Sequence, residues 1–184
     1  IIDPGCYFPA EQETLKNFLS DTGLTPVQLL NTHCHLDHVF GNKWVHETYG
    51  LELYIHPNEA QMLELAPVSG ERWGLPFQNY NGPIHFLNDG DTLLLGDTEI
   101  QVILAPGHSP GSICFYMPAQ GDLIGGDVLF RGSIGRTDLP GGDAETLLTS
   151  IREKLWLLPD ETVVYSGHGI KTTIGYEKRN NPFL

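Results

Sequence analysis

The chain has 184 residues, a net charge of −13 and a mean hydropathy of −0.16. This length suits one domain with a substantial core, and we expect a single domain over residues 1–184. No apolar run reaches the roughly 18 residues that a membrane span requires, and the acidic excess argues against nucleic acid as a partner.

The chain opens on two isoleucines followed by Asp3-Pro4-Gly5, a pattern that indicates the end of a strand running into a turn. We therefore expect the chain to start inside a fold. The three cysteines, which are odd in number and form no CxxC pair, predict neither a disulfide framework nor a zinc knuckle. A reducing, cytoplasmic location fits this composition.

Short apolar strands alternate with helical stretches in the first half of the chain. Apolar residues at spacings of three and four predict a helix over Pro9–Thr22 that ends at Gly23. The apolar runs at residues 27–31 and 53–56 predict two strands, and a helical stretch to Ala66 follows the second.

After Pro76 the sequence breaks into short apolar runs separated by Asp-Gly and Gly-Asp turns, which is typical of sheet strands. We expect strands over residues 84–87, 92–95, 99–104, 112–117 and 123–124, a helix over 144–157 and a strand over 162–166. Three tryptophans lie in apolar stretches and are predicted to be core residues: Trp44, Trp73 and Trp156. Strands alternate with helices in both halves, which predicts a layered α/β sandwich.

Residues 32–38, Thr-His-Cys-His-Leu-Asp-His, place four potential metal ligands within six positions, directly after an apolar strand. In an extended backbone His33 and His35 point to the same side and can bind one ion, whereas Cys34 points away. A turn that follows can bring Asp37 and His38 to a second ion. The alternative is a solvated polar loop, but such a loop gives four titratable groups no compensating interaction. We therefore expect two neighbouring metal ions.

Three later segments each place a ligand beside glycine at the end of a predicted strand. They are Gly107-His108, Gly126-Asp127 and Gly167-His168-Gly169. Glycine lets the backbone turn sharply and approach an ion closely. Taken alone, His108 and Asp127 are explained equally well as metal ligands or as ordinary turn residues. Beside the motif at 32–38, the three later segments complete a set of seven ligands.

The ordered set H-x-H-x-D-H, GHS, GGD and SGH resembles the metallo-β-lactamase-fold hydrolases over almost the whole chain. The resemblance implies a four-layer αββα sandwich, and family members usually carry strands upstream of the Asp3-Pro4-Gly5 segment that are missing here. It also implies seven metal ligands in two groups joined by a bridging carboxylate: His33, His35 and His108 for metal one, Asp37, His38 and His168 for metal two, and Asp127 between them.

The intact first motif beside Asp127 favours the glyoxalase II branch, and residues 133–143 and 180–184 resemble its short, single-domain bacterial members. The resemblance implies two divalent ions, zinc first with iron or manganese as alternatives. It implies a small-molecule thioester as substrate, S-lactoylglutathione or a related acylglutathione. A lactone hydrolase is the second reading. A persulfide dioxygenase with a single iron and a non-catalytic binding protein of the same fold are two others.

The expected chemistry follows from two cations a few ångströms apart, which lower the pKa of a shared water to about 7 and polarise a carbonyl. A thioester suits such a site because a thiolate, whose thiol has a pKa near ~8.5, leaves without help from a general acid. Asp37 is the expected catalytic carboxylate, since it can steer the hydroxide while it binds metal two. Asp3 either accepts a hydrogen bond from a ligand histidine or is a plain turn cap.

An anionic carrier such as glutathione needs a local basic patch on a protein with a net charge of −13. Seven of the ten cations follow residue 130. Arg136 occupies the position that resembles the family's carboxylate-binding lysine, and further candidates for substrate binding are Arg131, Lys171 and Arg179. Surface solubility explains any one of these residues equally well.

Residues 107–111 also match the G-x-S-x-G nucleophile elbow of serine hydrolases. We expect no such enzyme, because Pro110 lacks the backbone N–H that must follow the nucleophile as an oxyanion donor. The elbow also requires a helix next, whereas a strand is predicted over residues 112–117.

Overall fold

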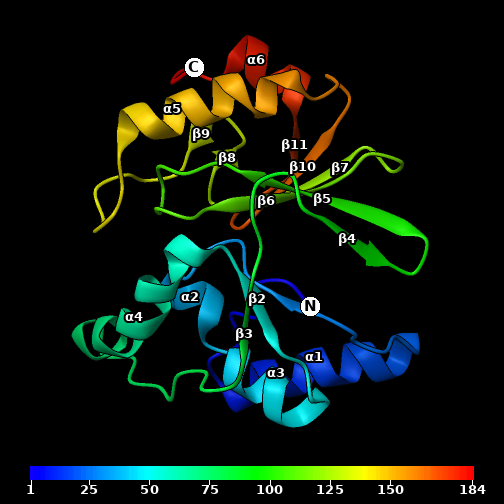
Figure 1. Cartoon of the computed structure of the whole chain (residues 1–184), viewed down its shortest axis with the longest axis vertical. Coiled ribbons are helices and arrows are strands. Elements are labelled where there is room, and N and C mark those ends of the chain that lie inside the picture. Colours follow the sequence, from blue (N-terminus) through cyan, green and yellow to red (C-terminus); the bar gives the residue numbers. More distant parts are fainter. The chain divides into compact units, whose positions relative to one another are not determined.

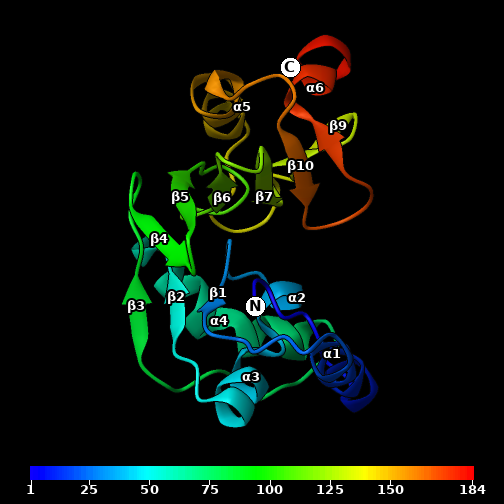
Figure 2. The ribbon, with the colours of Figure 1, turned by 90° about the vertical axis from the view of Figure 1, so that its right-hand side faces the viewer.

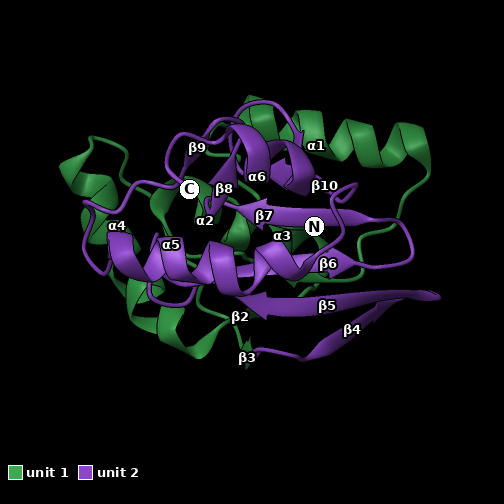
Figure 3. Cartoon of the chain, turned by 90° about the horizontal axis from the view of Figure 1, so that it is seen from above, with its two compact units in different colours: residues 1–86 green, residues 87–184 purple.

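A computed structural model describes all residues, 1–184, and divides the chain into two compact units, residues 1–86 and 87–184 (Figure 3). Each unit combines a β-sheet with helices, as the predicted α/β class requires. No helix of the structure is both long enough and apolar enough to cross a bilayer. The prediction of one domain over the whole chain stays a prediction.

The first unit is built on a three-stranded parallel sheet, in the order β1 (Leu29–Leu30), β2 (Leu53–Ile55) and β3 (Ile84–Phe86). Figure 2 shows these strands side by side. The helical elements of this unit are α1 (Pro9–Thr22), α2 (Leu36–Val39), α3 (Asn42–Tyr49), η1 (Pro57–Glu59) and α4 (Ala60–Arg72).

Local signals in the sequence explain where α1 begins and ends. Pro9 occupies the first turn, and the Glu11 carboxylate accepts a hydrogen bond from the Phe8 backbone N–H at 2.8 Å. Gly23 ends the helix with a φ of 66°, a left-handed conformation that glycine adopts without a Cβ clash. The predicted bounds of this helix are confirmed.

The core of the first unit lies where the sheet meets α3 and α4. Leu29, Leu53 and Ile55 of the sheet are fully buried together with Val45 of α3, and Leu63 of α4 is 3% exposed. Burial of each such side chain contributes about 1.5–3 kcal/mol. This packing fixes the end of β1, from which residues 31–38 emerge.

The second unit contains a six-stranded sheet in the order β11-β10-β7-β6-β5-β4. In chain order its strands are β4 (Thr92–Leu95), β5 (Thr98–Leu104), β6 (Ile113–Met117), β7 (Asp122–Gly126), β10 (Val163–Ser166) and β11 (Thr172–Thr173). A separate hairpin joins β8 (Leu129–Phe130) to β9 (Ser133–Ile134). The remaining elements are α5 (Ala144–Glu153), η2 (Leu155–Leu157) and α6 (Ile174–Asn180).

Helices α5 and α6 lie on the same side of this sheet (Figure 1). Leu147 and Ile151 of α5 are fully buried and pack in one cluster with Leu123 of β7 and Val164 of β10. Asp143 begins α5 as its N-cap, because its carboxylate accepts a hydrogen bond from the Thr146 backbone N–H at 2.7 Å.

The structure corrects two expectations. Trp73 is 68% exposed, so its prediction as a core residue is wrong; it follows the last residue of α4, three positions beyond the last buried residue, Gly70. Trp44 and Trp156 are partly buried against the two cores. The helix predicted over residues 144–157 divides into α5 and the short η2.

Candidate metal centre

In the first unit, four of the predicted ligands leave β1 and run into α2. His33 is fully buried and His38 is 4% exposed, whereas His35 is partly buried and the Asp37 side chain is 52% exposed. The ring centroids of His33 and His35 lie 4.8 Å apart, and those of His33 and His38 lie 4.0 Å apart. The structure therefore gathers the three imidazoles of the predicted motif.

Asp3, near the start of the chain, holds this segment in place through hydrogen bonds. Its Oδ1 accepts hydrogen bonds from the Thr32 backbone N–H at 2.7 Å and from Asn31 Nδ2 at 3.1 Å. Its Oδ2 accepts from the Thr32 hydroxyl at 2.6 Å and lies 3.1 Å from His38 Nδ1. Asp3 has a φ of 48°, in the left-handed region that aspartate tolerates better than most residues. Asp3 thus contacts His38, one of the predicted ligands.

These hydrogen bonds determine which nitrogen of each ring carries the proton and which carries the lone pair. The Thr32 hydroxyl has one proton and donates it to Asp3, so its 3.0 Å contact with His33 Nδ1 makes the ring N–H the donor. His38 likewise donates Nδ1–H to the Asp3 carboxylate. In both rings Nε2 then carries the lone pair that can bind a metal.

A close backbone approach explains the glycine of the Asp3-Pro4-Gly5 segment. A Cβ on Gly5 would lie 2.3 Å from the backbone oxygen of Asp37, closer than real Cβ contacts allow. Gly5 therefore lets the first residues of the chain pack directly against the ligand-bearing helix α2. The motif Asp-Pro-Gly thus combines the Asp3 hydrogen bonds with this contact.

In the second unit, the other three predicted ligands converge on one oxygen atom. Nε2 of His108 lies 3.6 Å from Oδ2 of Asp127, and Nε2 of His168 lies 3.6 Å from the same oxygen. Two ligand atoms that share a zinc ion, each about 2.1 Å from it at a tetrahedral angle, stand about 3.4 Å apart. Hydrogen bonds between nitrogen and oxygen are shorter, at about 2.7–3.2 Å. The spacing therefore fits ligands arranged around metal ions.

The parallel pairing of β7 with β10 brings Asp127 and His168 together. Ser166 is paired with Gly126, so that both strands end at the same edge of the sheet. The Gly167 backbone N–H donates to the Gly126 oxygen at 2.8 Å, which ties the two ligand loops together directly. Asp127 is the first residue after β7, and His168 is the second residue after β10.

His108 follows β5 and is 2% exposed. Its Nδ1 lies 2.8 Å from the backbone oxygen of Arg136, which can only accept a hydrogen bond. The ring therefore carries its proton on Nδ1, and Nε2, which faces Asp127, is the nitrogen that can bind a metal. The donor set, imidazole and carboxylate, suits zinc, iron or manganese.

The cations predicted to bind substrate have partners within the second unit. The Arg136 guanidinium binds both carboxylate oxygens of Asp138, at 2.7 and 2.8 Å, and this hydrogen bonding lowers the pKa of Asp138 to about 2. Arg179 pairs with Asp160 at 3.2 Å. Arg131 and Lys171 instead lie over tyrosine rings, those of Tyr176 and Tyr165 at 4.4 and 5.8 Å.

Cys34 belongs to the core of the first unit. Its side chain is 1% exposed, and burial, with the negative charge of Glu59 next, raises the pKa of its thiol well above the usual value. Its backbone N–H donates to the fully buried Glu59 carboxylate at 2.7 Å. Glu59 therefore stabilises residues 33–38, which carry the predicted ligands, by a buried hydrogen bond to their backbone. The sequence does not reveal this contact.

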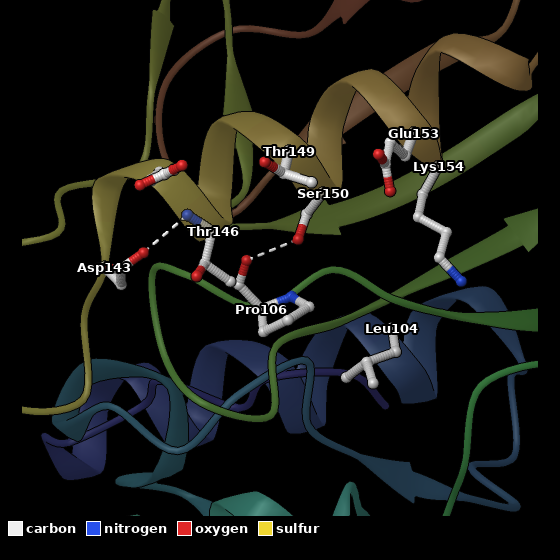
Figure 4. Close-up of a pocket in the computed structure, with 9 residues that line it drawn as sticks. Leu104, Pro106, Asp143, Thr146, Thr149, Ser150, Glu153 and Lys154 are labelled. Carbon is white, nitrogen blue, oxygen red and sulfur yellow. Dashed lines mark hydrogen bonds between the residues drawn. The ribbon is translucent and has the colours of Figure 1, made fainter.

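The structure offers no nucleophile elbow at residues 107–111. Ser109 is fully buried, its hydroxyl lies 2.7 Å from that of Ser112, and strand β6 follows rather than a helix. A separate pocket of about 480 Å³ runs along α5, between Pro106 and Lys154 (Figure 4). None of the seven predicted ligands lines it, so we assign it no part in metal binding.

An α/β fold that gathers imidazole and carboxylate groups at strand ends is typical of metal-dependent hydrolases. The chain belongs to the Metallo-beta-lactamase superfamily, whose family model matches residues 1–168. This membership confirms the predicted fold class.

Three similar proteins illustrate the range of the family. The hydroxyacylglutathione hydrolase GloC of Haemophilus influenzae is 41% identical over 100% of this chain and 86% of its own. The crystal structure of TTHA1623 in a di-iron-bound form is 43% identical with a TM-score of 0.91, covering 100% of this chain and 88% of that one. The structure of BLEG-1, a B3 metallo-beta-lactamase, is 41% identical with a TM-score of 0.90, covering 100% and 87%.

Proposed function

We propose that this metallo-hydrolase cleaves a thioester of an anionic thiol, with S-lactoylglutathione as the first substrate to test. One observation supports a pair of metal ions above all others: Asp127 Oδ2 stands 3.6 Å from Nε2 of both His108 and His168. A carboxylate oxygen placed equally close to two imidazoles suits a ligand shared by two ions. The same three groups also form the two-histidine, one-carboxylate set of mononuclear iron sites, so metal stoichiometry must separate the two cases.

The residues proposed to hold the first ion are His33, His35 and His108, those proposed for the second are Asp37, His38 and His168, and Asp127 is proposed to bridge them. Bound divalent cations would lower the pKa of a coordinated water and polarise the substrate carbonyl. Zinc is our first choice for both positions. The di-iron form of TTHA1623 makes iron the first alternative.

The chain's own residues orient three of the proposed ligands and place a carboxylate near the attacking water. Asp3 and Thr32 hold His33 and His38 with Nε2 as the ligand atom, and the Arg136 carbonyl does the same for His108. Asp37, whose side chain is half exposed and lies 3.7 Å from His38 Nε2, can accept a proton from an incoming water and orient it. The leaving thiolate needs no general acid, because its thiol has a pKa near ~8.5.

The substrate proposal is supported by the 41% identity to a hydroxyacylglutathione hydrolase. The similarity to a B3 metallo-beta-lactamase makes β-lactams a necessary comparison. A substrate panel therefore contains S-lactoylglutathione, two other acylglutathiones, a lactone and a β-lactam. Oxygen consumption with glutathione persulfide tests the dioxygenase alternative.

The test measures turnover across this panel beside the metal content of the same preparation. We expect about two metal ions per chain. We also expect kcat/KM for an acylglutathione to exceed that for the lactone and the β-lactam at least about 100-fold. Rapid lactone or β-lactam opening without acylglutathione turnover would reject the thioester assignment, and oxygen uptake with a single iron would reject hydrolysis.

Asp127→Asn provides the structural arm of the test, because a neutral amide oxygen binds a divalent cation more weakly than a carboxylate oxygen. We expect this variant to lose at least one ion and most of its turnover. Asp97→Asn removes the same charge from an exposed turn between β4 and β5 and serves as the matched control.

A further inference from the structure

Glu177 is a fully buried carboxylate on α6 that the proposed chemistry does not use. Its two oxygens accept hydrogen bonds from the Thr172 hydroxyl of β11, from the Gly132 backbone N–H at 2.9 Å and from Asn181 Nδ2 at 2.8 Å. A buried carboxylate is costly unless its oxygens are hydrogen-bonded, and this one joins three separate segments of the second unit.

Three consecutive residues of the β8–β9 hairpin, two in the turn and one at the start of β9, contact side chains of α6 and of the residue that caps its C-terminus. The Arg131 guanidinium lies 4.4 Å from the ring centre of Tyr176, and Gly132 donates to Glu177. The Ser133 carbonyl accepts a hydrogen bond from Asn181 Nδ2 at 2.9 Å. We call the side chains of Tyr176, Glu177 and Asn181 the α6 clamp.

The hairpin held by the α6 clamp is attached to two predicted ligands. Asp127 lies just before β8, and a Cβ added to Gly135, just after β9, would lie 1.9 Å from the Asp127 backbone oxygen. Gly135 therefore packs directly on the backbone of the bridging residue. The next residue, Arg136, supplies the carbonyl that holds His108 Nδ1 at 2.8 Å.

The third predicted ligand, His168, is connected to the α6 clamp through strand β11. His168 lies in the loop between β10 and β11, and the antiparallel pairing of Val164 with Thr172 closes this loop. The Thr172 hydroxyl donates to Glu177. In addition, the Ser166 hydroxyl donates to the Leu129 carbonyl of β8 at 2.6 Å. The hairpin and the His168 loop are thus held to each other and to α6.

We propose that Glu177 is a positioning residue for the metal ligands of the second unit. Its carboxylate joins the β8–β9 hairpin to β11 and keeps Asp127 Oδ2 equally spaced from His108 Nε2 and His168 Nε2. This inference rests on the metal site of the proposed function. A carboxylate accepts from all three of these donors as they stand. A glutamine can keep all three contacts only if its NH₂ group faces the Thr172 hydroxyl and that hydroxyl turns round to accept.

The test compares Glu177→Ala, Glu177→Gln and Asn181→Ala with Ile100→Ala. Ile100 is a buried residue of β5, near the opposite edge of the sheet from β11, so its truncation lowers stability without touching the clamp. For each protein, metal affinity is measured by competition with a chromophoric chelator, well below the thermal transition, and metal content by elemental analysis.

We expect Glu177→Ala to weaken the affinity for at least one ion by about 10- to 100-fold, the effect typical of losing a group that orients metal ligands. Glu177→Gln and Asn181→Ala, which retain part of the network, should lose roughly threefold to tenfold in affinity. Ile100→Ala should bind metal like the original chain. Glu177→Gln and Asn181→Ala test the inference even if Glu177→Ala fails to fold.

Unchanged metal affinity in Glu177→Gln and Asn181→Ala would overturn the inference, as would an equal loss in Ile100→Ala, because the effect would then follow stability alone. A failure of the proposed function looks different. In that case acylglutathione turnover is absent from the original chain while the variants still differ in metal affinity. A failed metal site would show as no stoichiometric metal in the original chain itself.

Discussion

Asp3 Oδ2 lies 3.1 Å from His38 Nδ1, so a carboxylate at the start of the chain selects the metal-facing nitrogen of a histidine 35 residues later. The same carboxylate holds Thr32, whose hydroxyl orients His33. One acidic side chain therefore sets the protonation pattern of two of the proposed ligands.

This arrangement predicts that Asp3→Asn weakens metal binding by about 10- to 100-fold. An asparagine NH₂ in place of Oδ2 would face both the Thr32 hydroxyl and His38 Nδ1–H. The hydroxyl can turn to accept, but the ring N–H cannot, so the hydrogen bond from His38 is lost and two donors oppose each other. We expect the free energy of unfolding to fall by about 1–3 kcal/mol in the same variant. Chelator competition and urea denaturation measure the two effects.

Asp21→Asn is the charge-matched control for this substitution, because Asp21 lies exposed near the end of α1. It should change neither quantity. An Asp3→Asn protein that binds metal as tightly as the original chain would show that Asp3 is only a turn cap.

Removal of metal should lower the thermal stability of the protein. An ion that binds only the folded chain stabilises it by about 2.7 kcal/mol when its concentration is 100 times its dissociation constant. For a chain of this size, 1 kcal/mol corresponds to about 2–4 °C. We therefore expect the melting temperature to fall by about 5–10 °C for each such ion on dialysis against a chelator, and to recover when metal is returned.

Calorimetry of the same preparation with and without chelator measures this change. The Asp127→Asn variant should show a smaller difference between the two conditions, since it has lost a shared ligand. Equal melting temperatures for the original chain in both conditions would contradict a metal that is part of the folded structure.

Much of the fold could be predicted from the sequence because its strongest patterns are local. The apolar periodicity and the flanking Pro9 and Gly23 predict α1 with its observed bounds, and the run over residues 92–95 predicts β4. By contrast, α6 was not predicted. It has only seven residues, includes Gly175 and several charges, and is stabilised by tertiary contacts such as those of Glu177.

The proposed ligands were predictable because imidazoles and carboxylates beside glycine at strand ends form a recognisable pattern. Their supports were harder to find. Glu59 and Glu177 resemble ordinary helical glutamates in the sequence, yet both are fully buried. The group that orients His108 is a backbone carbonyl, which no residue type reveals. Such contacts depend on long-range packing. Of these supports the sequence pointed only to Asp3, and it left a plain turn cap as an equally good interpretation.

Ser109→Ala should leave turnover within about fivefold of the original chain, because Ser109 is a buried hydrogen-bonding residue and not the nucleophile. Loss of a true serine nucleophile lowers kcat by about a millionfold. We expect the free energy of unfolding to fall by about 1 kcal/mol, through the lost contact with the Ser112 hydroxyl. Labelling with a fluorophosphonate probe should be absent in both proteins, and a labelled Ser109 would refute this account.

The pairing of Arg136 with Asp138 predicts opposite effects for two substitutions. If Arg136 attracts an anionic thioester, Arg136→Gln raises KM because it removes the positive charge. Asp138→Asn lowers KM because it releases the guanidinium from a carboxylate that binds it through two hydrogen bonds. Each change should be about twofold to tenfold, since exposed charges are screened by salt, and both should shrink as ionic strength rises.

The pH dependence of this effect follows from the Asp138 pKa, which the Arg136 guanidinium lowers to about 2. A carboxylate with a lowered pKa stays ionised above that value, so the pairing persists throughout pH 5–9 and weakens only when the pH falls toward 2. The ratio of KM between the original chain and Asp138→Asn should therefore be constant over pH 5–9. Steady-state kinetics with S-lactoylglutathione measure this ratio, and an unchanged KM in both variants would remove Arg136 from substrate binding.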